Sequence, residues 1–224
     1  MHDKVFMKGV QLLKIIILCA VSAVCNAALS HFVINLARLP LYQDTVFTIA
    51  MCFSAGLFAG FLTGAFSCFF ISFVVYGYIL GIFLPRVGYL FYACVIVEVL
   101  LVCFFHGKMK KREEVFLQKP SLQSFIYIAP LLLGLAALDC IAVSITGGII
   151  DFTLTSLNVP RSISPEDTFK LGLLWNNVPL LSASILSRIP INIVDRFIAI
   201  FGGYGVSLLF RKWIINGKEN PRVS

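Results

Sequence analysis

Charged residues are scarce in this chain, because Asp, Glu, Lys and Arg together make up only 13% of its 224 residues. An ordinary soluble domain carries about 25% charged and about 45–50% apolar residues. Here hydrophobic residues reach 59%, and the mean hydropathy is +0.93. This composition excludes a soluble enzyme domain, a disordered chain and a disulfide-stapled secreted module. The uncharged runs are continuous, without the alternation of β-barrel strands, and therefore predict an all-α, polytopic integral membrane protein.

Sequence motifs for catalysis are missing as well. The chain has no Gly-x-Ser-x-Gly or His-Glu-x-x-His motif and no phosphate-binding loop followed by Lys. Its three histidines are far apart in the sequence, and its seven cysteines form no Cys-x-x-Cys pair. We therefore expect no enzymatic activity, no metal site and no cofactor, and active transport would need a partner that hydrolyses ATP.

The uncharged intervals predict the number of membrane spans. Between Lys14 and Arg38 lie 23 uncharged residues, and between Asp44 and Arg86 lie 41. A helix of that second length would measure about 60 Å, twice the bilayer core of about 30 Å, so the interval must hold two spans. We expect a single domain, residues 1–224, with six spans at 12–36, 46–60, 62–83, 88–105, 122–149 and 189–210.

The segment 150–188 is predicted to be an outer loop with some helix in it. Ser164-Pro165-Glu166-Asp167 has the residue types of a helix start. Pro179, Arg188 and Pro190 interrupt the apolar stretch that follows. We interpret residues 174–187 as a short re-entrant or interfacial helix, and a full seventh span is the alternative.

The distribution of basic residues predicts the orientation. Twelve of the 18 Lys and Arg residues lie before the first span, in 106–119 and after residue 210. The positive-inside rule then places both termini on the cytoplasmic side of a bacterial-type cell membrane. A seventh span would move the basic C-terminus outside. Nucleic-acid binding is not expected, because the basic residues are scattered and lack interleaved aromatic residues.

Polar residues inside the apolar segments are candidates for function, because a charge there costs roughly 2.5–3.5 kcal/mol on insertion scales. They are Glu98, Asp139, Arg188, Asn192, Asp195 and Arg196. They would either line a polar pocket or form structural ion pairs, such as Glu98 or Asp139 with Arg188 or Arg196. Asp195 and Arg196 are consecutive, so on a helix they should point about 100° apart and not serve one partner face.

A second candidate group lies on the outer side and suits a small polar, aromatic ligand. Asn35 and Asp44 follow the first span, and Trp175, Asn176 and Asn177 lie in the long outer loop. A stacking ring with neighbouring amides predicts substrate binding, while an interfacial anchor is the alternative for Trp175.

Small residues form a third pattern. Ala23 and Ala27 give the first span a smooth face, and Gly56, Gly60 and Gly64 fall near the middle of the long uncharged interval. Such faces allow close helix contact, either with a partner protein or within the chain. The glycines would form the turn between two spans or let them approach closely.

Two segments carry a resemblance to a known family. Leu39-Pro-Leu-Tyr-Gln-Asp44-Thr45, and Ile189-Pro-Ile-Asn192-Ile-Val-Asp195-Arg196 followed by Gly202-Gly-Tyr204, resemble segments of the substrate-binding S component of energy-coupling factor (ECF) transporters. Six spans with both termini inside and no nucleotide site also fit that family.

The resemblance implies that a vitamin or other micronutrient binds near the outer face, under the first, third and fifth loops. It also implies that the chain docks, through Ala23 and Ala27, on a membrane coupling subunit with two cytoplasmic ATPases. The alternative is a regulatory membrane protein that senses a ligand or partner without transport.

Overall fold

The computed structural model describes residues 2–75, 88–118, 121–159 and 166–215, and this part of the chain is helical without strands. The elements are α1 (His2–His31) with its continuation η1 (Phe32–Leu36), α2 (Val46–Ala55), α3 (Leu57–Phe69) with η2 (Phe70–Val75), η3 (Tyr89–Phe91), α6 (Tyr92–Gln118), α7 (Leu122–Ser156), α8 (Asp167–Trp175), α9 (Leu180–Leu186) and α10 (Ile189–Ile215). The predicted all-α class is confirmed for these residues.

Four segments are long and apolar enough to cross a membrane: Gln11–Leu36, Tyr89–Glu114, Phe125–Ser156 and Leu180–Ile214. The chain is therefore a multi-pass membrane protein, as the composition predicted. The expected spans at 46–60 and 62–83 correspond to the shorter helices α2 and α3, and residues 76–83 lie outside the described residues.

The outer segment 150–188 contains helix, but not as the single piece expected over 174–187, because α8 and α9 are separated at 176–179 and α7 continues to Ser156. Helix α8 begins at Asp167 after Glu166, whose side chain makes no cap hydrogen bond. Ser164 and Pro165 lie outside the described residues. Pro190 does not interrupt α10, because it lies in the first turn of that helix, where a missing N–H is tolerated.

Helix α1 has the surface pattern of a lipid-facing helix. Its small and polar side chains point inward, and large apolar side chains, among them Leu13, Ile17 and Val24, are about half exposed. Lipid tails are as apolar as leucine, so helices in a bilayer pack through small residues instead. Ala23 and Ala27 are 0% and 7% exposed, so this face packs inside the chain and is not open to a partner, contrary to the docking prediction.

Helices α2 and α3 form a hairpin. Gly56 closes it with φ +88°, a value that residues with side chains rarely adopt. A Cβ on Gly60 would lie 2.3 Å from Sγ of Cys52, and one on Gly64 would lie 2.5 Å from a methyl group of Val95. Both expectations for the glycines are confirmed: Gly56 makes the turn, and the other two allow close packing.

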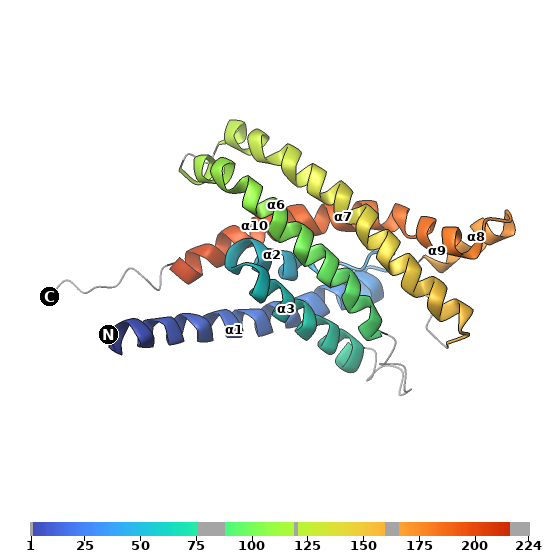
Figure 1. Ribbon diagram of the computed structural model, residues 1–224, viewed down its shortest axis with the longest axis horizontal. Coiled ribbons are helices and arrows are strands. Elements are labelled where there is room, and N and C mark those ends of the chain that lie inside the picture. The colour runs from blue at the N-terminus through green and yellow to red at the C-terminus, as the bar shows by residue number, and fades with distance from the viewer. Residues whose placement is uncertain (1, 76–87, 119–120, 160–165, 216–224) are drawn as a thin grey trace.

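Figure 1 shows that the start of α1 and the end of α10 lie at the same end of the molecule, while α8 and α9 lie at the opposite end. Helix α10 packs on α2 and α7, and α6 packs on α7 and α3. The core between them includes Ile49, Phe53, Val99, Leu132 and Ile200. The connection 37–45 between η1 and α2 meets the first turns of α10, and this junction contains the candidate site.

Candidate functional site

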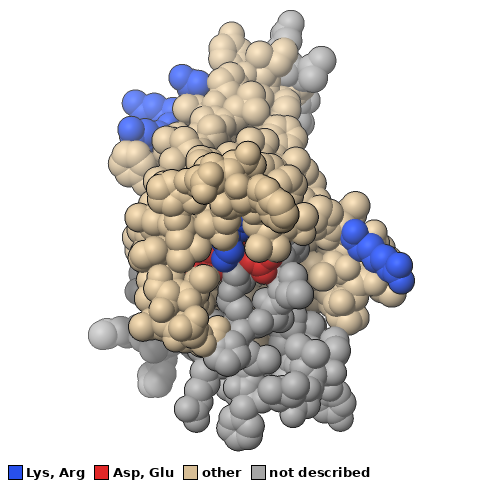
Figure 2. Space-filling view, turned by 90° about the vertical axis from the view of Figure 1, so that its right-hand side faces the viewer, with Lys and Arg blue, Asp and Glu red and all other residues tan. Residues whose placement is uncertain are grey.

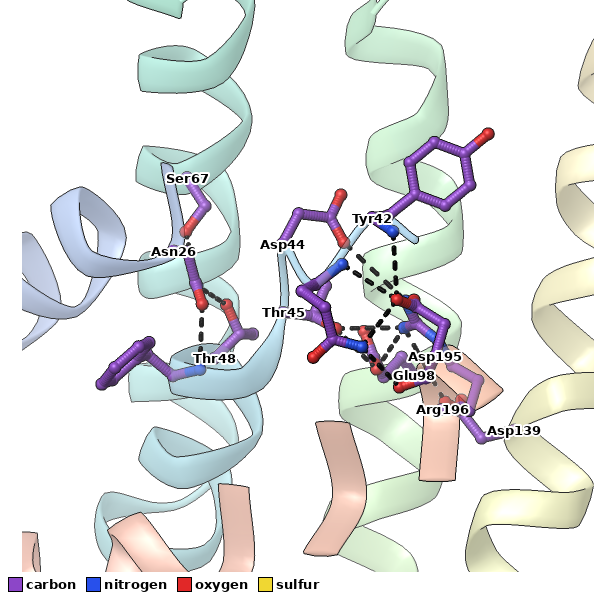
Figure 3. A network of polar contacts seen from close by, with 12 residues as sticks. Asn26, Tyr42, Asp44, Thr45, Thr48, Ser67, Glu98, Asp139, Asp195 and Arg196 are labelled. Atoms are coloured by element: carbon purple, nitrogen blue, oxygen red, sulfur yellow. Dashed lines mark hydrogen bonds and ion pairs between the residues drawn. The ribbon is translucent and has the colours of Figure 1, made fainter. Parts of the chain in front are cut away.

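A buried cluster of charges surrounds Arg196, in the second turn of α10. Its Nη1 lies 2.6 Å from Oε1 of Glu98 on α6 and donates to the Thr45 hydroxyl at 3.0 Å (Figure 3). The same nitrogen lies 4.0 Å from Oδ2 of Asp139 on α7. The Thr45 hydroxyl donates in turn to Glu98 at 3.0 Å. One guanidinium thus connects α6, α7, α10 and the start of α2.

Asp195 fastens the connection 37–45 to α10. Its Oδ1 accepts hydrogen bonds from the backbone N–H groups of Tyr42 (3.1 Å) and Gln43 (2.9 Å) and from the Gln43 amide (2.8 Å). Its Oδ2 pairs with Arg196. The Asp195 carboxylate is therefore fully partnered, and it holds a turn in which Gln43 has φ +46°.

The expectation that Asp195 and Arg196 could not serve one partner segment is wrong. Asp195 bonds Tyr42 and Gln43, and Arg196 bonds Thr45, so both contact the same short stretch. The physical reason is that the stretch bends around the start of α10, and the long arginine side chain turns back toward its neighbour.

Acids outnumber bases in this cluster. Asp44 lies 3.7 Å from Nη2 of Arg196, so four carboxylates surround one guanidinium. The Asp44 side chain is 35% exposed, whereas those of the other three acids are at most 1% exposed. Burial raises the pKa of Asp44, and the Arg196 guanidinium offsets part of that shift. Asp44 is therefore the carboxylate of this cluster that is partly exposed at the protein surface.

Tyr42 links this cluster to a second ion pair. Its hydroxyl donates to Glu166, which is also paired with Arg188 at the start of α10, and Arg188 lies 5.2 Å from the centre of the Phe91 ring. Burial and the negative charge of Glu166 raise the pKa of Tyr42 well above its usual value, so the phenol is a neutral donor. The connection 37–45 is thereby tied to the segment before α8.

Helix α8 is fixed to α7 by a buried lysine. Nζ of Lys170 lies 2.8 Å from Asp151 and 3.6 Å from Asp167, and the lysine side chain is 6% exposed. Figure 2 views the end of the molecule opposite to the termini and shows a few blue and red atoms in a hollow between tan side chains. Charged groups therefore reach the surface at this end.

A third polar group lies nearer the termini. Arg211 pairs with Glu113 at 2.7 Å and donates to the backbone carbonyl of Phe53 at 3.1 Å. His106 lies 3.3 Å from Glu113. This group joins α6 to α10 and to the end of α2.

Asparagines connect helices elsewhere. Asn192 donates to the Ser144 hydroxyl at 2.8 Å and so joins α10 to α7. Asn26 donates to Thr48 and Ser67, both at 2.9 Å, and accepts the N–H of Phe47. Asn192 was expected as a polar residue of the last span, but Asn26 was not singled out, although its amide in an apolar stretch was the available signal.

The structure does not gather the predicted substrate-binding set. Only Asp44 joins the Arg196 cluster. Asn35 is exposed and bonds His31 one turn away, and Asn176 bonds the carbonyl of Gly172 in its own helix. The Trp175 side chain is 89% exposed, and Asn177, at φ +59°, turns the chain after α8. Trp175, Asn176 and Asn177 therefore end an exposed helix instead of lining a pocket.

An apolar cavity of about 550 Å³ lies between α1, α3 with η2, and the start of α6. Its lining includes Ala20, Phe66, Phe69 and Tyr92, and no charged residue from the part of the chain that the structure describes. Such a lining offers a small charged ligand no ion-pairing partner. The junction of 37–45 with α10 is therefore the better candidate site for a polar ligand.

Comparison with known proteins yields no relative. No family model matches the chain, no curated protein matches it, and no solved structure matches it. What defines the class is therefore the fold itself: a multi-pass, all-helical membrane protein with a buried ionic junction.

Proposed function

We propose that the chain is the substrate-binding S component of an ECF-type transporter and takes up a small water-soluble vitamin or micronutrient. Partner subunits, a membrane coupling subunit and two cytoplasmic ATPases, would supply ATP hydrolysis. The observation that carries the proposal is that the two segments with family resemblance contact each other. Asp195 bonds Gln43 and Arg196 bonds Thr45 across about 150 residues of sequence.

The proposed topology has six crossings, with α2 and α3 as the second and third. Thr45, at the N-cap of α2, is bonded to Arg196, and Phe53, in the last turn of α2, is bonded to Arg211. The ten residues of α2 rise about 15 Å, half of the roughly 30 Å apolar core. In the proposed topology, the connection 37–45 would supply the rest of this crossing.

The proposed orientation places both termini on the cytoplasmic side of the cell membrane. The start of α1 and the end of α10 lie together in Figure 1, and exposed basic residues follow the apolar part of α6 at Lys108, Lys110 and Lys111. The positive-inside rule supports a cytoplasmic location for that end. The junction of 37–45 with α10 then faces outward.

The connection 37–45 is the proposed substrate contact. Asp44 offers a partly exposed carboxylate, and Asp195 and Glu166 hold the residues just before it. A ligand bound here would contact a segment whose position is determined by α10 and by the start of α8. Binding and the arrangement of the outer helices would therefore be coupled.

A thermal-unfolding screen of the purified protein against water-soluble vitamins tests this proposal. A ligand at 100 times its Kd stabilises a folded protein by about 2.7 kcal/mol, which is readily measured. We expect one compound to raise the unfolding midpoint, and we expect Asp44→Asn to reduce that shift. Asn35→Ala is the control, because Asn35 is exposed and bonds only its own helix. If no compound shifts a well-folded sample, and no small molecule is extracted from it, the proposal is refuted.

A further inference from the structure

The Arg196 cluster contains one acid with no counter-charge of its own. Glu98 lies 2.6 Å from the guanidinium, and Asp195 contacts it while accepting three N–H donors. Asp139 is 0% exposed and lies 4.0 Å from the nearest guanidinium nitrogen. Neither Asp139 oxygen has a hydrogen-bond donor among the described residues, and neither has Glu98 Oε2.

An ionised, unpartnered carboxylate at such a position would be very costly. Transfer of a lone charge to an apolar interior is so unfavourable that the group is normally neutralised instead. Two carboxyl groups that share one proton satisfy this requirement, because the protonated one donates to the other. Oε1 of Glu98 and Oδ2 of Asp139 lie 2.6 Å and 4.0 Å from the same nitrogen, Nη1 of Arg196, so the two carboxyl groups lie close together. A hydrogen bond between them requires a proton on one of them.

We propose that Glu98 and Asp139 share one proton and form a proton-binding site between α6 and α7, beneath the connection 37–45. With the proton, the buried carboxyl groups of Glu98, Asp139 and Asp195 carry two negative charges beside the single positive charge of Arg196. Loss of the proton adds a third buried negative charge and weakens the junction that holds 37–45.

The groups that face the pair are known for each helix packed against it. They are Arg196 and Asp195 from α10 and Asp44 from the connection 37–45, and the thiols of Cys52, Cys68, Cys94 and Cys140 are within electrostatic range of Glu98 or Asp139 without a hydrogen bond to either. Helices α2 and α3 contain no Asp, Glu, Lys or Arg. No group of three His, Cys, Asp or Glu residues in the described part could hold a metal ion, so the geometry favours a proton over a metal cation.

Infrared spectroscopy of the purified protein tests the site directly. We expect a protonated-carboxyl C=O band at neutral pH that shifts in D₂O and is lost both in Asp139→Asn and in Glu98→Gln, because the remaining acid then pairs with Arg196. Glu114 lies on α6, as Glu98 does, and is exposed, so Glu114→Gln is the matched control and should keep the band.

A stability measurement gives an independent readout. The unfolded chain releases this proton near pH 4, the ordinary range for Asp and Glu. In the pH range where the folded protein keeps it, the folding equilibrium constant should fall about tenfold per pH unit relative to Asp139→Asn. The infrared band and the pH slope report protonation only. They can therefore be absent while vitamin binding is present, and they can be present while vitamin binding is absent.

Three results would overturn the proposal. One is the absence of the band in the wild-type protein at neutral pH. Another is its persistence in Asp139→Asn, and the third is its loss when NaCl is added at constant pH, which would assign the site to a metal cation. The wild-type titration needs no variant, so the proposal stays testable if a substitution prevents folding.

Discussion

Replacement of Arg196 by glutamine should be the most damaging single change at the outer junction. The side chain is 4% exposed, lies 2.6 Å from Glu98, contacts Asp195 and donates to Thr45. Glutamine keeps a hydrogen-bond donor but leaves the acids without their cation. Removal of one partner of a buried ion pair costs about 3–5 kcal/mol, and we expect at least that loss in the free energy of unfolding.

The assay is reversible unfolding in mixed detergent micelles, with Arg112→Gln as the control. Arg112 is exposed on α6 and, among the described residues, bonds one backbone carbonyl, so its replacement should change stability by less than about 0.5 kcal/mol. The double variant Arg196→Gln/Glu98→Gln should recover part of the loss, because it removes one stranded charge. A loss below about 1 kcal/mol for Arg196→Gln, or no recovery in the double variant, would refute the ionic account of this junction.

Three further substitutions test other contacts, and each is measured by the same unfolding assay. Asn26→Ala should cost about 1–3 kcal/mol because it strands buried donors and acceptors on α2 and α3, whereas the exposed Asn35→Ala should be nearly neutral; equal effects would contradict this. Gly60→Ala should cost about 1–3 kcal/mol because its Cβ would lie 2.3 Å from a sulfur atom, while Gly107→Ala meets open space and should be neutral or stabilising; a tolerated Gly60→Ala would show that the hairpin is looser than described. Tyr42→Phe should cost about 1.5–3 kcal/mol through the lost bond to a charged carboxylate, and an unchanged stability would show that this bond contributes little.

The membrane class and the long helices could be predicted from the sequence because they depend on local composition. A long apolar segment has few alternatives in a bilayer, and four helical segments are long and apolar enough to cross one. The break at Gly56 was also predictable in kind, since glycine adopts positive φ without a side-chain clash. The short length of α2 was not, because the chain before it stays close to α10 as an irregular segment.

The site was predictable only in part. Charged residues inside spans identified Glu98 and Arg196, and their pairing was one of the open alternatives. Which arginine pairs with which acid depends on helix rotation and on the path of 37–45, and neither is encoded in residue spacing. Trp175 had the right chemistry for stacking but lies at an exposed helix end. The contact between Tyr42 and Glu166, which ties two outer segments together, could not be predicted, because the two residues are 124 positions apart in sequence.

Hydrogen–deuterium exchange of the connection 37–45, with and without each water-soluble vitamin, tests the central claim most directly. The Tyr42 and Gln43 amides are bonded to Asp195, so their exchange reports whether this segment is held. If a vitamin binds at this segment, one compound should slow exchange at 37–45 and at the start of α10, and Asp195→Asn should speed exchange in the free protein. Unchanged exchange at 37–45 with every compound would rule out substrate contact there, as would protection confined to the region around Trp175.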